Sequence, residues 1–358
     1  MESHIYCVIM AGGAGTRFWP ISRTARPKQF LDILDTGKTF IRSTFERFAT
    51  FLPPENFLIV TNSIYKDIVL EQIPEIGEGQ VLSEPLGRNT APCIAYAAFR
   101  LRAMDPEATM IVAPSDHIVL DESAFRSVVE EAVSFAAPRD ALVTIGVTPT
   151  RPATGYGYIQ VGGAVDGTGL RKVKTFTEKP NLELAKAFLA SGEFYWNSGI
   201  FVWSVRSILA AMERLLPDTC QLFDSISDCY CTDGEQEAIE RIYPECRAIS
   251  IDYGIMEKAD NVYVRCGDFG WSDIGTWGSM YEYLPKDEDG NSGGNTVFFD
   301  SDKCLVKLPA GKLAVIEGLH DFIVVDTDDV LMVCPKDNEQ NIKKFIDTVR
   351  FTKGDRFV

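Results

Sequence analysis

The sequence predicts an α/β fold in which a mostly parallel, mixed sheet is flanked by helices and followed by a small C-terminal β module. Three observations predict it. Strand-like and helix-like segments alternate through the first 150 residues, which is typical of parallel strands joined by right-handed crossovers. A glycine-rich loop directly follows the first apolar segment. Beyond residue 295, short strand-like segments follow one another without helices between them.

In the N-terminal part, apolar runs of strand length alternate with amphipathic stretches of helix length. The expected strands are 5–10, 57–61, 80–83, 109–113 and 141–147, and the expected helices between them are 40–51, 65–73, 91–104 and 124–136. Ligands of such Rossmann-like sheets bind beyond the carboxyl ends of the strands. The glycine-rich loop and the turn at 114–117 both fall there.

The rest of the chain has a mixed pattern. Strands are expected at 158–161, 172–177, 194–203 and 261–266, a helix at 182–191, short strands at 296–299, 304–308, 313–317, 322–325 and 330–334, and a last helix at 338–351. A polar, glycine-rich boundary at 286–295 separates two predicted domains. They are 1–285, with parts at about 1–150 and about 151–285, and 293–358, a sheet or a partial β-helix with a terminal helix. The second domain shows no obvious catalytic group, which favours packing or subunit contact over substrate binding.

Composition excludes several classes of function. The chain has 358 residues and a formal net charge of −16, so it would repel the backbone of a nucleic acid. No apolar run reaches the ~18 residues that a membrane span needs. The three histidines argue against a histidine-rich metal centre or a Ser-His-Asp triad. The nine cysteines are scattered without a Cys-x-x-Cys pair, and no leader is recognised, so the expected location is the cytoplasm.

The loop after the first strand has the chemistry of an anion site. Glycines stand at positions 12, 13 and 15, so backbone amides can approach a phosphate closely. Four cations follow, at positions 17, 23, 26 and 28, and no acidic residue occurs between Ser3 and Leu31. A nucleoside triphosphate needs such a loop because its charge sits on the phosphates.

Two common glycine-rich loops are excluded by spacing. The dinucleotide pattern G-x-G-x-x-G would begin at Gly13, but its third glycine position is Phe18. A P-loop needs a Lys and a Ser or Thr directly after its last glycine, and Thr16 and Arg17 follow Gly15 instead. A plain strand-to-helix turn would not require the neighbouring cations.

A series of motifs carries a resemblance to a known family. In chain order they are Gly12-Gly13-x-Gly15-Thr16-Arg17-Phe18-Trp19-Pro20-x-Ser22-Arg23, Pro27-Lys28-Gln29-Phe30, Glu84-Pro85-x-Gly87-Arg88-Asn89-Thr90-Ala91-Pro92, Pro114-Ser115-Asp116-His117, Phe176-x-Glu178-Lys179-Pro180, Trp196-Asn197-Ser198-Gly199-Ile200-Phe201 and Gly270-Trp271-Ser272-Asp273-Ile274-Gly275-Thr276-Trp277. The chain thereby resembles the sugar-1-phosphate nucleotidylyltransferases, and in the fuller form the mannose-1-phosphate guanylyltransferases. The resemblance implies a nucleotide-diphospho-sugar transferase fold.

The resemblance also implies a reaction. GMP would pass from GTP to α-D-mannose 1-phosphate by direct attack on the α-phosphorus, giving GDP-mannose and pyrophosphate. The sugar phosphate is already an ionised nucleophile, so neither a covalent intermediate nor a general base is needed. Two alternatives stay open: a guanylyltransferase for another sugar 1-phosphate, and a non-catalytic regulator that binds GDP-mannose. A homodimer is also left open.

Two cations are the candidate catalytic residues. Arg17 is expected to bind the β- and γ-phosphates, because a guanidinium can bind phosphate oxygens in a bidentate way. Lys28 is expected at the α-phosphate, as a compact charge near the reacting centre. Arg23 and Arg26 could equally contact triphosphate or form ion pairs.

Asp116 and Asp273 are the candidate ligands for Mg²⁺, or another divalent cation, which usually takes one or two protein carboxylates. Only the family resemblance implies that the two act together. The alternatives are a turn or helix cap at Asp116 and an N-cap at Asp273 on a helix through Thr276 and Trp277. His117 is expected to be structural.

The remaining candidates contact the two substrates. The nucleotide-binding set is Ala11, Gly12, Gly13, Gly15, Thr16, Pro85, Arg88, Asn89, Thr90 and Asp116. The sugar-binding set is Gly155, Tyr156, Gly157, Glu178, Lys179, Asn197, Ser198 and Gly199. Asn89 could instead cap the following helix, and Glu178 and Lys179 could form a plain exposed ion pair.

Overall fold

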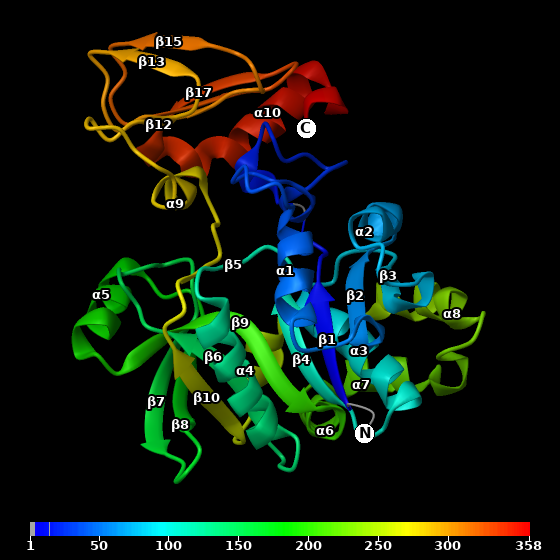
Figure 1. The fold of residues 1–358 in the computed structure, drawn as a ribbon. Helices are drawn as coiled ribbons and strands as arrows, with labels where there is room; N and C mark the ends of the chain where they lie inside the picture. Colours follow the sequence, from blue (N-terminus) through cyan, green and yellow to red (C-terminus); the bar gives the residue numbers. More distant parts are fainter. Residues whose placement is uncertain (1–3, 14) are drawn as a thin grey trace. The chain divides into compact units, whose positions relative to one another are not determined.

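A computed structural model of the protein describes residues 4–13 and 15–358. The chain divides into two compact units (Figure 1). The sheet unit holds the described residues up to Gly12 together with Ile41–Ser272, and the coil unit holds the described residues of Gly13–Phe40 together with Asp273–Val358.

The sheet unit is built on one mixed sheet with helices on its faces. In spatial order its strands are β3 (Val81–Glu84), β2 (Phe57–Asn62), β1 (Ile5–Met10), β4 (Thr109–Pro114), β9 (Phe194–Ser204), β6 (Leu142–Val147), β10 (Val262–Gly267), β8 (Arg171–Thr177) and β7 (Tyr158–Ala164). Strands β3, β2, β1 and β4 are parallel, and β10 is parallel to β6. Strand β9 runs antiparallel to both β4 and β6, and β8 and β7 continue the sheet antiparallel. The predicted α/β class is confirmed.

Helices cover this sheet on both faces. They are α1 (Phe40–Ala49), α2 (Lys66–Gln72), α3 (Thr90–Met104), α4 (Glu122–Ala136), α5 (Leu182–Ser191), α6 (Val205–Leu215), α7 (Pro217–Asp224) and α8 (Glu235–Ile242). Residues of α3, α6, α7 and α8 share a buried core with Val8 of β1 and Val112 of β4. Helices α1 and α4 pack together through the rings of Phe48 and Phe125, 5.5 Å apart at their centroids. Helices α6, α7 and α8 were not predicted from the sequence.

Short elements complete the sheet unit. Strands β5 (Ile118–Val119) and β11 (Trp271–Ser272) pair antiparallel, which brings the segment after β4 next to the segment after β10. A single π-helical turn spans Asp252–Met256. None of the helices in the described residues is both long and apolar enough to cross a membrane.

The coil unit carries the C-terminal β module. Its strands are β12 (Ser292–Gly293), β13 (Thr296–Phe299), β14 (Leu305–Lys307), β15 (Ala314–Glu317), β16 (Phe322–Asp326) and β17 (Leu331–Pro335), and its helices are α9 (Trp277–Tyr281) and α10 (Ile342–Lys353). Thr296 pairs in parallel with Ala314, and Leu305 with Ile323. In each of these two pairs the partners are 18 residues apart in the sequence, so the chain winds in successive coils of a short β-helix. Strand β17 then runs antiparallel to β16.

Candidate functional site

The glycine-rich loop of the coil unit is closed by contacts among its own residues. The side chain of Gln29 donates to the carbonyl of Gly13 at 2.9 Å, and the hydroxyl of Ser22 donates to the carbonyl of Gly15 at 2.6 Å. Gly15 has φ +56°, and a Cβ atom there would stand 2.6 Å from the backbone nitrogen of Lys28. A side chain at position 15 would therefore displace the segment that carries Lys28.

Lys28 is fixed inside this loop. Its side chain is buried, and its Nζ donates to the backbone carbonyl of Asp273 at 2.6 Å. The same ammonium lies 4.9 Å from the ring centroid of Phe40 and 5.7 Å from that of Phe18, within the range of cation–π attraction. Two predicted site residues, 245 positions apart, are thus brought together.

Arg17 and Asp273 both lie close to Gly275. A Cβ atom at position 275 would stand 2.9 Å from Asp273 Oδ2 and 3.1 Å from Arg17 Nη1. The guanidinium and the carboxylate therefore lie close to one another, next to a residue that has no side chain. The N-cap of helix α9 is Thr276, whose hydroxyl accepts from the amide of Ser279 at 3.1 Å, so the capping alternative for Asp273 is wrong.

A cavity opens beside Arg17. It has a volume of about 340 Å³ and lies wholly within the coil unit. We call it the Arg17 pocket, and it is lined by Thr16, Arg17, Thr276, Glu339, Gln340, Ile342 and Lys343. Residues of the glycine-rich loop and of the C-terminal segment thus border the same cavity.

The other two loop arginines differ. Arg23 pairs with Asp329, with its Nη1 at 2.9 Å from Oδ2, and this hydrogen bond lowers the pKa of the Asp329 carboxyl. Arg23 therefore takes the ion-pair alternative. The side chain of Arg26 is exposed.

The sheet unit presents its candidates at the carboxyl ends of β1 and β4. The amide of Ala11 donates to Val60 at 2.8 Å, and its carbonyl accepts from the hydroxyl of Thr61 at 2.9 Å. The amide of Ser115 donates to the carbonyl of Met10 at 3.0 Å, which holds the end of β4 beside the end of β1. Ala11 and Asp116 therefore follow neighbouring strands at the same edge.

Asp116 is half-buried beside His117. The Nε2 of His117 lies 3.9 Å from Asp116 Oδ1, and its Nδ1 shares a hydrogen bond with the indole NH of Trp271 at 3.2 Å. The rings of His117 and Trp271 meet edge to face. His117 has the structural role that the sequence predicts.

Glu84 begins the Glu84–Ala91 segment expected at the base, but it is not in the predicted nucleotide-binding set. It ends β3 with its side chain buried, and the hydroxyl of Tyr243 donates to its Oε1. Its Oε2 lies 3.0 Å from where a Cβ atom of Gly12 would be, and Gly12 is exposed. Burial raises the pKa of this carboxyl to about 7, against the opposing effect of the Tyr243 hydrogen bond. The sequence signal that could have identified Glu84 is a charged residue at the end of an otherwise apolar strand.

The segment after Glu84 is fastened to the chain around residue 245. Asn89 has φ +67°, and its side chain accepts from the amide of Thr90 at 2.9 Å, so it caps α3 as the alternative proposed. The hydroxyl of Thr90 accepts from the amide of Ile251 at 2.9 Å, and Arg88 donates to the carbonyl of Pro244. Of the nucleotide candidates here, Pro85 and Thr90 are half-buried and Asn89 is exposed.

The first sugar candidates form a compact group. Lys179 Nζ lies 2.7 Å from Glu178 Oε1, and the side chain of Glu178 is only 9% exposed against 57% for Lys179. A Cβ atom at Gly157 would overlap Oε2 of Glu178. The carbonyl of Tyr156 accepts from the amide of Lys179 at 3.2 Å. The predicted ion pair therefore exists, with its carboxylate mostly covered. Gly155 is exposed.

Asn197 connects this group to a second carboxylate. Its Nδ2 donates to Asp252 Oδ1 at 2.9 Å, and its Oδ1 accepts from the hydroxyl of Thr144 at 2.9 Å. Burial, and next the charge of Glu178, raise the pKa of Asp252 to about 6. Sequence reasoning missed Asp252, because an isolated acidic residue in an unassigned stretch carries no signal.

The two residues that follow Asn197 in the chain make hydrogen bonds within the protein. Ser198 is buried, and its hydroxyl donates to the carbonyl of Ile145 at 2.8 Å. Gly199 has φ +71°, and its amide donates to Asn197 Oδ1 at 3.3 Å. The hydroxyl of Ser198 thus has a partner inside the sheet.

Asp116 and Asp273, the predicted metal ligands, belong to different units, and each carries the carboxylate oxygens that a hard divalent cation binds. Within residues 4–13 and 15–358, no group of three or more His, Cys, Asp or Glu side chains is arranged to hold a metal ion. Mg²⁺ typically takes one or two carboxylates and completes its shell with phosphate and water oxygens. Asp116 and Asp273, both half-buried, offer such carboxylates.

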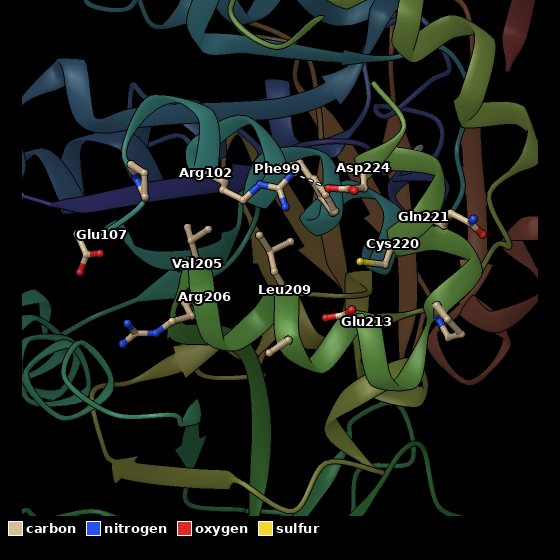
Figure 2. A pocket seen from close by; sticks show the side chains of 13 residues that line it. Phe99, Arg102, Glu107, Val205, Arg206, Leu209, Glu213, Cys220, Gln221 and Asp224 are labelled. Carbon is tan, nitrogen blue, oxygen red and sulfur yellow. Dashed lines mark hydrogen bonds and ion pairs between the residues drawn. The ribbon is translucent and has the colours of Figure 1, made fainter. Parts of the chain in front are cut away.

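A different cavity lies in the sheet unit between α3, α6 and α7 (Figure 2). Its volume is about 810 Å³. Arg102 lies over the ring of Phe99 and donates to Asp224 at 2.7 Å. None of the predicted site residues lines this cavity, so we leave it outside the candidate site.

Comparison with known proteins gives a consistent answer. Residues 6–290 match the family model described as nucleotidyl transferase, and residues 294–349 match the model of a MannoseP isomerase/GMP-like beta-helix domain. The chain is 36% identical to a mannose-1-phosphate guanylyltransferase of Salmonella montevideo, over 96% of this chain and 73% of that protein. It is 35% identical to one of Escherichia coli, over 97% and 76%.

A solved structure agrees along almost the whole chain. It is that of a mannose-1-phosphate geranyltransferase from Thermus thermophilus, with a TM-score of 0.87 and 30% identity over 97% of this chain and 100% of that one. The second family model also agrees with the coils seen in the C-terminal module. The chain therefore belongs to the nucleotidyl transferase family, among its mannose-1-phosphate guanylyltransferase members.

Proposed function

We propose that this protein transfers GMP from GTP to α-D-mannose 1-phosphate and releases pyrophosphate. Family membership supports the reaction, and one observation carries it: Arg17, Lys28 and Asp273 gather in the coil unit. Two mutually repelling phosphates must meet for this reaction, and fixed cations beside a metal-binding carboxylate lower that barrier.

The two cations have different tasks in the proposed mechanism. Arg17, exposed at its pocket, binds the β- and γ-phosphates and stabilises the charge on the departing pyrophosphate. Lys28, held by the carbonyl of Asp273, keeps a fixed positive charge for the α-phosphate. The phosphate oxygen of the sugar attacks directly, so its anomeric bond stays intact.

Asp116 and Asp273 would hold Mg²⁺ or another divalent cation. The ion supplies Lewis-acid polarisation of phosphate oxygens and neutralises their charge. Lys28 positions the backbone of Asp273. Strand β11 precedes Asp273 and strand β5 follows Asp116, and the pairing of these two strands positions both segments.

Backbone groups and Glu84 would recognise the nucleotide. We propose that Gly12, Gly13, Gly15 and Thr16 present their backbone to the nucleotide, and that Ala11, Pro85, Arg88, Asn89 and Thr90 shape the site of the base. Guanine carries two adjacent donors, N1–H and the exocyclic amine. An ionised Glu84 carboxylate beside the exposed Gly12 can accept from both, which adenine cannot provide.

Glu178, Lys179 and Asn197 would contact the sugar phosphate. The carboxylate of Glu178 can accept from sugar hydroxyls, and the mostly exposed Lys179 can reach the phosphate. Gly155 and Gly157 leave room for the ring beside Tyr156. The amide of Gly199 holds the side chain of Asn197, and Ser198 ties the same strand to Ile145.

The domain limits and the setting are also proposed. Residues 1–285 would be the catalytic domain, with nucleotide bound by about 1–150 and sugar by about 151–285, and 293–358 a separate module. The limits of the two family models, 6–290 and 294–349, support this division. All nine cysteines are free thiols, which supports a cytoplasmic location. The net charge of −16 supports the absence of a nucleic-acid partner.

A homodimer is supported by an apolar face on the β module. Val297 and Val315 pair across β13 and β15, and Phe299 and Leu313 lie nearby in the same strands and loop; all four are 44% to 65% exposed. We expect Val315→Lys to convert a dimer to a monomer in light scattering. A wild-type monomer at micromolar concentration would contradict the dimer.

Turnover assays test the function. The protein with Mg²⁺ is assayed for pyrophosphate release with GTP, ITP, ATP or UTP against mannose, glucose and fucose 1-phosphates. We expect GTP with mannose 1-phosphate to have the highest kcat/KM. A higher value with another sugar would favour the alternative substrate. Binding of GDP-mannose without any turnover would favour the regulator.

A further inference from the structure

We propose that Lys343 on helix α10 is a second cation of the Arg17 pocket, and that it binds the terminal phosphates of the nucleotide and the pyrophosphate product. The proposal rests on the proposed function, because it assigns a residue to the leaving-group end of that reaction. It gives the C-terminal module a direct part in substrate binding, which the sequence analysis did not expect.

The geometry lies within one unit. Arg17 comes from the 3-10 turn Thr16–Phe18, and Lys343 comes from the first turn of α10, yet both line one cavity of about 340 Å³ (Figure 1 shows α10 beside the loop). A cavity of this size is at the lower end of the ~300–1,000 Å³ typical of small-ligand sites. Ile342, only 2% exposed, anchors the start of α10 and thereby places Lys343 at the rim.

Both cations are available for a ligand. Among the residues that the structure describes, neither Arg17 nor Lys343 has a carboxylate within the 4.0 Å of an ion pair. Both side chains are exposed. Two neighbouring cations that are not neutralised by protein carboxylates repel one another, and a polyphosphate bound between them removes that cost.

The Arg17 pocket is also lined by one acidic residue, Glu339, whose carboxylate has a hydrogen-bond partner. Glu339 Oε2 accepts from the backbone amide of Gly278 at 2.7 Å, at the start of α9. A Cβ atom at Gly278 would stand 3.2 Å from both carboxylate oxygens, so the glycine lets the carboxylate approach the helix end. Glu339 thus joins the turn before α10 to α9. The residues that line the pocket include two cations and one anion, and the carboxylate of Asp273 lies near Arg17 outside the lining.

The chemistry of the two cations suits a phosphate chain. The guanidinium of Arg17 can hold two oxygens of one phosphate, whereas the ammonium of Lys343 is a mobile point charge that can follow the chain when it leaves. Gln340 and Thr16 add neutral donors to the same wall. Mannose 1-phosphate has no pyrophosphate group, so Lys343 should not affect its binding.

The experiment compares Lys343→Gln with the matched control Lys344→Gln, which removes the next, also exposed, lysine outside the pocket. In the forward reaction KM for GTP should rise about tenfold, with kcat and KM for mannose 1-phosphate nearly unchanged. In the reverse reaction KM for pyrophosphate should rise likewise. Lys343→Arg should recover most of the loss, and the control should match wild type.

A binding measurement keeps the test independent of turnover. Titration calorimetry with pyrophosphate and Mg²⁺ should show weaker binding to Lys343→Gln than to wild type, at equal melting temperatures. Equal pyrophosphate affinities, or equal losses in both variants, would overturn the role of Lys343. Failure of the wild type to turn over GTP with mannose 1-phosphate would instead remove the proposed function.

Discussion

The ammonium of Lys28 donates a hydrogen bond to the backbone carbonyl of Asp273 at 2.6 Å. A cation from the glycine-rich loop thereby fixes the main chain that carries a proposed metal ligand. The carboxylate of Asp273 stays directed toward Gly275 and Arg17. The position of Lys28, which we propose to bind phosphate, is therefore coupled to that of the Asp273 main chain, so a change in one shifts the other.

We expect Lys28→Met to lower kcat about 100-fold with a smaller effect on stability. Methionine keeps much of the apolar packing against Phe18 and Phe40 but cannot donate to Asp273. Pyrophosphate release and thermal melting measure the two effects. Lys186→Met, an exposed lysine on α5, is the control. Unchanged kcat/KM would remove Lys28 from the mechanism.

We expect Asp273→Asn to lose most turnover while retaining the fold. The amide keeps the shape of the side chain and the backbone carbonyl that Lys28 binds, but it is a much weaker ligand for Mg²⁺. Rates are measured over a Mg²⁺ titration, with circular dichroism as a check of folding. A near-normal rate at low Mg²⁺ is the result that would remove Asp273 from the metal site.

Gly15→Ala should destabilise the protein more than Gly37→Ala does. Both glycines have positive φ, +56° and +81°, which costs a non-glycine residue about 1–2 kcal/mol. Only at position 15 does the added Cβ meet backbone, 2.6 Å from Lys28 N, whereas position 37 has open space. Melting temperatures give the comparison, and equal shifts would show that the loop adapts.

Gly157→Ala should raise KM for mannose 1-phosphate and leave KM for GTP nearly unchanged. The new Cβ would overlap Oε2 of Glu178 and displace the carboxylate proposed to bind the sugar. The matched control is Gly163→Ala, because no atom lies within 4 Å of a Cβ atom at that position. Gly163 belongs to strand β7, which begins directly after Gly157. If both variants keep the wild-type KM, Glu178 does not bind the sugar.

The raised pKa of Glu84 should make both stability and GTP binding depend on pH. Its pKa is about 7 in the folded protein and 4.5 as a free group, so the folded state binds the proton more tightly. The protonated Glu84 therefore contributes to the free energy of unfolding. This contribution is complete below pH 4.5 and is lost as the pH rises through 7, and the free energy of unfolding changes by at most about 3 kcal/mol. Glu84→Gln lacks it, so the variant should gain stability relative to wild type between about pH 5 and 8.

The same ionisation should tighten GTP binding. Only the carboxylate accepts from both guanine donors, so wild-type KM for GTP should fall between about pH 6 and 8, and more for GTP than for ITP, which lacks the amine. In Glu84→Gln this difference should disappear. An unaltered preference for GTP over ITP in the variant would show that another group reads the base.

Elements with strong local signals could be predicted from the sequence. Helix α5 spans 182–191 as expected, because Asn181 caps it and Gly192, at φ +68°, ends it. Strands β1 and β13 also have the predicted bounds, since apolar β-branched runs between polar turns mark them. These features depend on residues that are close in the chain.

Helices α6 and α7 were missed because no turn separates them from their neighbours. Ser204 ends β9 and at the same time caps α6 by accepting from the amide of Ser207. Leu216 alone lies between α6 and α7, with Pro217 as the first residue of α7. Because no glycine or polar linker separates these elements, the hydrophobic pattern of the sequence could not be divided into a strand and two helices.

The contacts of the candidate site residues could not be predicted from the sequence. The sequence indicates Lys28 and Asp273, but only folding shows that a backbone carbonyl joins them. The raised pKa of Glu84 needs burial and a partner, Tyr243, that is 159 residues away. Distant partners and burial of this kind leave no mark on a local motif.

The 18-residue offset that the parallel pairs β13–β15 and β14–β16 share has an evolutionary consequence. An insertion or deletion of one whole coil keeps every inward-facing side chain inward, whereas half a coil would turn the strand pattern inside out. Related chains should therefore differ in length here by complete coils, with the antiparallel β17 closing the stack in each.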